Sequence, residues 1–169
     1  VLFARTDSVY KSLPDCDVYD VERNALTWPG GCPVIAHPPC RLWGRLRRLS
    51  KAPEGERELA TWAVSQVREW GGVLEHPAGS TLWQAAQLPQ PGERDDFGGF
   101  TIWISQWWFG HKADKPTWLY ICGIEPADLP ELPYRIGEPA FVVNTSKRAG
   151  SKGHRPEISK SEREHTPLA

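Results

Sequence analysis

The sequence contains no methionine, no C-x-x-C pair and no apolar run of about 18 residues, the length that spans a membrane. The missing apolar run excludes a transmembrane helix, and Val1–Ala4 is too short for the core of a signal peptide. Because methionine is missing even at position 1, we expect a processed chain or one that begins inside or just after its native start. The four cysteines lack the spacing of a zinc ribbon or a thioredoxin-like pair, which predicts a reducing, cytoplasmic compartment.

A strong net charge is also absent. Twenty Lys and Arg stand against 21 Asp and Glu, which gives a net charge of −1 and excludes a histone-like basic binder or an acidic tail protein. The length of 169 residues suits one domain with a real core. Tryptophan is abundant, with nine residues, and we expect the cluster at Trp103, Trp107, Trp108 and Trp118 to lie mostly in that core.

Short apolar runs alternate with helical patterns along the chain. Pro33–Ala36 and Val73–Glu75 are typical of buried strands, and the apolar spacing within Glu54–Trp70 predicts an amphipathic helix between them. Phe100–Trp108 and Thr117–Cys122 predict further strands. This alternation favours a mainly parallel α/β sheet flanked by helices, a Rossmann-like core of three layers. We predict one such domain over residues 1–144 and a polar, basic segment over 145–169, which is either mobile or dependent on a partner.

Unusual residues follow the first two predicted strands. One strand ends in His37-Pro38-Pro39-Cys40, and the next ends in Glu75-His76-Pro77. Because neighbouring parallel strands end at the same edge of a sheet, Cys40, Glu75 and His76 are predicted to share a pocket. The alternative for Cys40 is an inert buried thiol. The alternative for Glu75 is an ion pair with an arginine of the basic loop that follows Cys40.

The segment Arg41–Lys51 carries five cations and Trp43 but no acidic residue. Cations interleaved with an aromatic ring suit a phosphate backbone and a stacked base, whereas the alternative is an ordinary solvated loop. His37, His76 and His111 with Cys40 also have the chemistry of zinc ligands, although their spacing fits no standard zinc pattern. Histidines in such loops more often serve as hydrogen-bonding residues.

Three motifs together resemble known proteins. Pro39-Cys40 followed by Glu75-His76-Pro77 resembles the catalytic half of the cytosine-C5 DNA methyltransferases, which carry a Pro-Cys nucleophile and a later Glu-Asn-Val strand end. Asp17–Asp20 is similar to the acidic strand end of that family. The chain looks still more like phage and prophage proteins labelled methyltransferase-like, which share a Phe-Gly-His…Lys-x-Thr segment, here Phe109 to Thr117. The likeness covers roughly Asp17 to Leu119.

The resemblance implies a methyltransferase-like transferase that acts on a pyrimidine of a nucleic acid or nucleotide in the cytoplasm of a bacterial host. Cys40 would add to C6 of the ring, and Glu75 would act at N3. S-adenosylmethionine is the implied cofactor, but Val1–Asp7 lacks the glycine-rich loop of the family, and no target-recognition domain fits in the remaining length. A non-catalytic nucleic-acid- or nucleotide-binding module and a metal-dependent hydrolase are the alternatives. The residues assigned to the substrate are His37, Pro39, Arg41, Arg45, His76, His111, Lys115 and Thr117, and those assigned to the cofactor are Asp17 and Asp20.

Overall fold

The structure is a computed structural model that describes residues 1–45, 47–144 and 149–164. The chain forms two compact units. Unit 1 comprises Val1–Trp103 and Trp118–Leu129, and unit 2 comprises Ile104–Thr117 and Pro130–Ala169. This division does not test the predicted boundary at residue 144 between a folded domain and a polar C-terminal segment, so that boundary stays a prediction.

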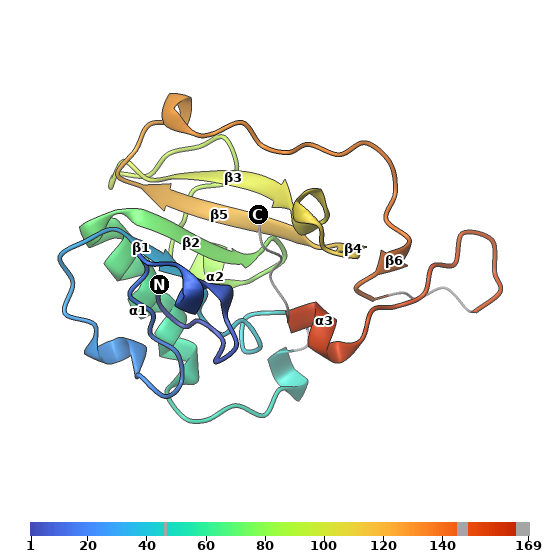
Figure 1. Ribbon diagram of the computed structural model, residues 1–169, viewed down its shortest axis with the longest axis horizontal. Helices are drawn as coiled ribbons and strands as arrows, with labels where there is room; N and C mark the ends of the chain where they lie inside the picture. Colours follow the sequence, from blue (N-terminus) through green and yellow to red (C-terminus); the bar gives the residue numbers. More distant parts are fainter. Residues whose placement is uncertain (46, 145–148, 165–169) are drawn as a thin grey trace. The chain divides into compact units, whose positions relative to one another are not determined.

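The principal sheet has four strands in the order β1-β2-β5-β3. Helix α1 connects β1 to β2, and the short helix α2 follows β2 (Figure 1). In unit 2, the strands β4 and β6 form a separate parallel pair. The bounds of the strands are Val34–Ala36 (β1), Gly72–Pro77 (β2), Phe100–Ser105 (β3), Ala113–Asp114 (β4), Pro116–Cys122 (β5) and Phe141–Val142 (β6); those of the helices are Glu56–Trp70 (α1), Leu82–Ala85 (α2) and Lys160–Glu164 (α3).

The prediction of a mainly parallel, Rossmann-like sheet is wrong. Only β1 and β2 pair in parallel within the four-stranded sheet, and β5 runs antiparallel to both of its neighbours, as the opposed arrows of β3 and β5 show (Figure 1). The connection from β3 to β5 explains the difference, because a parallel pair needs a crossover of a dozen or more residues, usually a helix. Here residues 106–115 hold only a 3-10 turn and the two-residue strand β4.

The β1-α1-β2 unit confirms the local part of the prediction. Val34 pairs with Gly72 and Ala36 with Leu74, both in parallel register, and α1 covers most of the predicted helix. The buried face of α1 is built around small residues, so the helix approaches the sheet closely; these residues are Ala60, Ala63, Val64 and Val67. Leu2 extends the parallel arrangement by single bridges to Ala36 and Tyr19.

Gly72 determines how β2 begins. Its φ is +113°, in the region that favours glycine, and a Cβ atom there would lie 2.0 Å from the carbonyl oxygen of Val34. The Gly71-Gly72 pair after α1 thus allows the backbone to leave the helix and pair at once with β1 as the first residues of β2.

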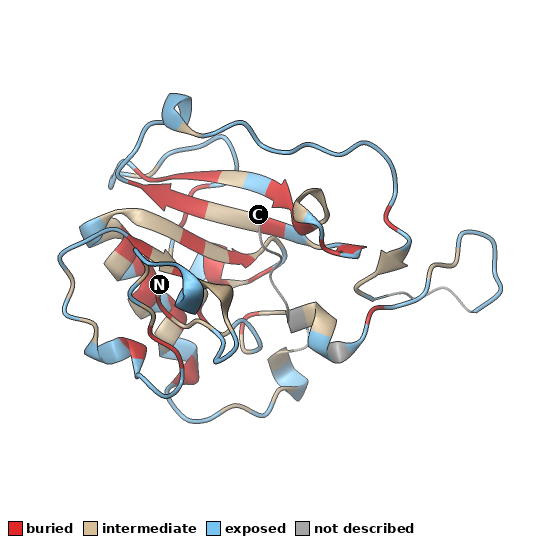
Figure 2. Cartoon of the chain, in the orientation of Figure 1, coloured by how far each residue is buried: buried red, intermediate tan, exposed pale blue. Residues whose placement is uncertain are grey.

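The core of unit 1 lies around β1, β2 and α1, and also holds Trp43 and Trp83 (Figure 2). The expectation that the later tryptophans are mostly core is only partly met. Trp118 packs against Trp83 with ring centroids 5.1 Å apart, whereas Trp103 is 44% exposed. Within the described ranges, no helix is long and apolar enough to cross a membrane.

Candidate functional site

The parallel register brings two predicted site residues together. One position beyond the Ala36–Leu74 pair, His37 follows β1 while Glu75 continues β2. Nδ1 of His37 lies 3.0 Å from Oε2 of Glu75, and both side chains are about five-sixths buried, with exposed fractions of 17% and 16%. The sequence predicted that Cys40, Glu75 and His76 meet at the strand ends, whereas the contact that the structure shows there joins Glu75 to His37.

His76 does not join that pair. Successive residues of a strand point to opposite faces, so the side chains of Glu75 and His76 leave β2 in opposite directions. His76 is completely buried against Trp83, with ring centroids 6.3 Å apart, and burial lowers its pKa to about 4. No other described residue hydrogen-bonds to either ring nitrogen. His76 is thus a core residue, and its predicted contact with substrate has no geometric support.

Cys40 lies in a turn that is fixed on both sides. Pro38 before it is buried and Pro39 is half-buried, while the carbonyl of Cys40 accepts hydrogen bonds from the backbone N–H groups of Trp43 and Gly44, both at 3.0 Å. Trp43 is 2% exposed and anchors the turn in the core. The thiol-bearing residue itself is exposed. Cys40 is therefore not the buried residue that the alternative predicted, and its reactivity stays a prediction.

The cations after Cys40 fall into two groups. Arg41 forms an ion pair with Glu56 at the start of α1, in which Nε lies 2.6 Å from Oε1, and Arg47 donates to the carbonyl of Gly44. By contrast, Arg45, Arg48 and Lys51 are exposed, and no ion pair links them to another described residue.

Trp43 is not available as a stacking surface in the way the sequence suggested. Its ring is buried, and the guanidinium of Arg57, from the first turn of α1, covers it at 3.9 Å from the ring centroid. Its indole Nε1 is buried and has no hydrogen-bond partner in the described part of the chain.

The two carboxylates assigned to the cofactor are held by cations of this chain. Asp17 pairs with Arg23. Asp20 is buried and pairs with Lys11, and this contact, together with the backbone N–H groups of Arg23 and Glu22, lowers the pKa of Asp20 to about 2. Both carboxylates thus have a cationic partner within the chain, and their assignment to S-adenosylmethionine stays a prediction.

The remaining predicted residues lie in unit 2 and serve its own packing. The ring nitrogens Nδ1 and Nε2 of His111 lie 2.7 Å and 3.0 Å from the carbonyl oxygens of Ala113 and Glu162. The hydroxyl of Thr117, which is completely buried, donates to the carbonyl of Lys115 and accepts from the amide of Gln106. Lys115 is half-buried. His111 and Thr117 thus have partners within unit 2, and their contact with a substrate stays a prediction.

A metal site has no ligand set in the part of the chain that the structure describes. No group of three or more His, Cys, Asp or Glu side chains there is arranged to hold an ion. The metal-dependent hydrolase consequently stays a prediction without geometric support.

Tyr10 belongs to the site but was missed by sequence reasoning. It lies in a 3-10 turn, η1 (Val9–Ser12), and its ring is 5.7 Å from that of His37 at an interplanar angle of 30°. Burial and the negative charge of Glu75 raise the pKa of Tyr10. One turn of 3-10 helix has no periodicity in a sequence, so no pattern could have placed this ring beside a strand 24 residues later in the chain.

No protein-family model, no curated protein and no solved structure matches the chain.

Proposed function

We propose that this protein modifies a pyrimidine base by covalent catalysis, with Cys40 as nucleophile and Glu75, held by His37, as the carboxylate that acts at N3 of the ring. The proposal is carried by the hydrogen bond between His37 and Glu75 at the ends of two parallel strands, three residues before an exposed cysteine. A thiol nucleophile and a positioned carboxylate are the two groups that this covalent chemistry needs.

Burial bears on which nitrogen of the His37 ring donates. Nε2 of His37 is buried and has no hydrogen-bond partner within the described ranges. A buried N–H without an acceptor is costlier and rarer than a buried acceptor without a donor. Donation from Nδ1 to Glu75 therefore leaves no buried N–H of this ring without an acceptor, and it holds the carboxylate of Glu75 in place.

The addition step balances without a further reactant. The proton of the Cys40 thiol passes through solvent water to Glu75, and the sulfur forms a bond to C6 of a cytosine. The π electrons of the C5–C6 bond move to C4–C5, those of the C4–N3 bond move onto N3, and N3 takes the proton from Glu75. The product is an adduct with a nucleophilic C5 atom. The addition itself uses no methyl donor.

The exposed cations support a nucleic-acid or nucleotide substrate. Arg45, Arg48 and Lys51 follow Cys40 within eleven residues and are not neutralised by any described acidic group. Positive charges of this kind bind phosphates and release counterions. Their position in the sequence would bring a phosphate group to the same segment that presents the thiol.

The proposal is tested with a single-stranded oligonucleotide that contains 5-azacytosine. This ring adds a thiol at C6 and takes its proton at N5, so the adduct needs no methyl donor. We expect intact-mass spectrometry to show one oligonucleotide bound per chain, with the modified peptide containing Cys40. Cys40→Ser should abolish the adduct, whereas Cys32→Ser, which alters another exposed cysteine, should leave it unchanged. Adduct formation by Cys40→Ser would rule out this nucleophile.

The unpaired cations also favour a second candidate function, a non-catalytic nucleic-acid-binding module, because phosphate binding needs no thiol. The Cys40→Ala, Glu75→Ala double variant separates the two. Unchanged oligonucleotide affinity in this variant, together with the absence of any wild-type adduct, would favour the binding module.

A further inference from the structure

The ring of Tyr10 lies against the imidazole of His37, and none of the sequence motifs described above includes Tyr10. The two rings are tilted by only 30°, with centroids 5.7 Å apart, and Tyr10 is half-buried. The charge of Glu75 acts on the phenol, so Tyr10 lies near both members of the hydrogen-bonded pair.

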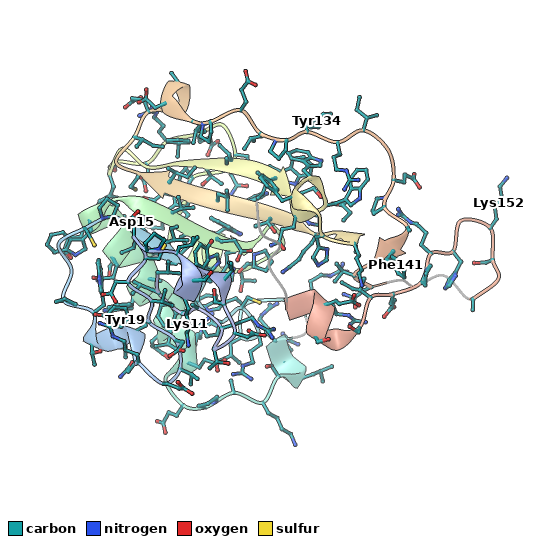
Figure 3. The ribbon with its side chains drawn as sticks, viewed as in Figure 1. Lys11, Asp15, Tyr19, Tyr134, Phe141 and Lys152 are labelled. Atoms are coloured by element: carbon teal, nitrogen blue, oxygen red, sulfur yellow. The ribbon has the colours of Figure 1, made fainter. Side chains whose placement is uncertain are left out.

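The 3-10 turn that carries Tyr10 is anchored independently of the site. Lys11, the next residue, pairs with the buried carboxylate of Asp20 (Lys11 is labelled in Figure 3). Asp20 is itself fixed, because its Oδ1 accepts the backbone N–H groups of Glu22 and Arg23 at 2.9 Å and 3.0 Å. The turn also has its own hydrogen bonds, including one from the Ser12 hydroxyl to the carbonyl of Val9 at 2.7 Å. The backbone at Tyr10 is thus fixed by the ion pair of its neighbour Lys11 with the buried Asp20.

We propose that Tyr10 is a positioning residue that fixes the plane of the His37 ring and shields its Nδ1–Glu75 hydrogen bond from water. This inference rests on the proposed function for its consequence, which is that Glu75 stays in place to act on the substrate ring. Without the ring of Tyr10, water would compete for Glu75 and the imidazole could rotate about its side-chain bonds. The carboxylate would then lose its fixed position.

The aromatic ring, rather than the hydroxyl, carries this role. The raised pKa of Tyr10 keeps the phenol neutral at neutral pH, so it adds no charge beside Glu75. Phenylalanine at position 10 should therefore preserve the effect, and alanine should remove it.

The test is a proton and nitrogen NMR measurement on the His37 imidazole. In the wild type we expect a proton on Nδ1 that exchanges slowly with water. Tyr10→Ala should speed its exchange by about tenfold, and Tyr10→Phe should leave the rate within about twofold. Tyr134→Ala removes an exposed tyrosine of unit 2 and serves as the matched control, with an unchanged rate. A merely structural role would lower stability without changing this signal.

A second readout is the rate of adduct formation with the 5-azacytosine oligonucleotide, which Tyr10→Ala should lower by about tenfold. If the wild type forms no adduct, the proposed function fails, and the imidazole signal still tests Tyr10. If Tyr10→Ala does not fold, Lys11→Ala loosens the same turn from outside the site and should speed the exchange by about threefold. A folded Tyr10→Ala or Lys11→Ala protein with the wild-type exchange rate, or a wild type without the slow proton, would overturn the inference.

Discussion

The imidazole of His76 lies in the apolar core, where burial lowers its pKa from an ordinary 6.5 to about 4. The unfolded chain therefore binds a proton at pH values where the folded chain does not. Stability is full above pH 6.5, decreases as the pH falls from 6.5 to 4, and loses nothing further from this residue below pH 4.

His76→Leu tests this dependence. We expect the free energy of unfolding of the wild type to fall by about 2 kcal/mol between pH 7.5 and pH 5 because of this residue alone. In His76→Leu that part of the loss should disappear, since leucine does not titrate. Urea denaturation of both proteins at the two pH values measures the difference, and an equal pH dependence in both would contradict a buried neutral imidazole.

Tyr120 joins α1 to the loop before β3 through a buried polar cluster. Its hydroxyl donates to Oδ2 of Asp95 at 2.7 Å and accepts from Nε of Arg68 at 3.2 Å. The thiol of Cys122 donates to the same hydroxyl at 3.1 Å. Tyr120→Phe leaves these three partners without the hydroxyl, so we expect unfolding to become easier by about 1–3 kcal/mol. Tyr134→Phe is the matched control: that side chain is 68% exposed, and its loss of a hydroxyl should change stability by less than about 0.5 kcal/mol in the same urea titration.

At the scale of an element, Gly72 limits how α1 can be joined to β2. Gly72→Ala should destabilise unit 1 by several kcal/mol or prevent its folding, because the new Cβ would collide with the Val34 carbonyl. Gly31→Ala is the control that separates the collision of the new Cβ atom from the cost of a positive φ for alanine. Gly31 also has a positive φ, +94°, but nothing lies within 4 Å of its Cβ position, so a cost of about 1 kcal/mol is expected. Similar losses in the two variants, measured by thermal unfolding, would show that the close approach is unimportant.

At the scale of the whole molecule, the four free cysteines differ in accessibility. Cys32 and Cys40 are exposed, Cys16 is half-buried, and Cys122 is buried with a pKa raised by that burial. Brief alkylation of the folded protein should therefore label Cys32 and Cys40 first and Cys122 only after unfolding. Peptide mass spectrometry gives the order, and early labelling of Cys122 would contradict the packing of unit 1.

The sequence allowed correct prediction where one short stretch determines the structure. The apolar spacing of α1 and the adjacent strands β1 and β2 predicted the β1-α1-β2 unit, but not that Glu75 would meet His37 rather than Cys40 and His76. The direction of β5 depends on its partners across the sheet, so strand composition alone could not reveal it. The contrast between Glu75 and His76 was also missed, because both follow the same apolar run and only the alternation of strand faces separates them.

That alternation has a consequence for the pairing of β2. A slip by one residue would turn Glu75 into the apolar core and His76 out to the other face. An unpaired carboxylate in the core is strongly unfavourable, so the acid itself discourages the wrong pairing. The residue that acts at N3 in the proposed chemistry thereby also helps the chain to choose the alignment in which that chemistry is assembled.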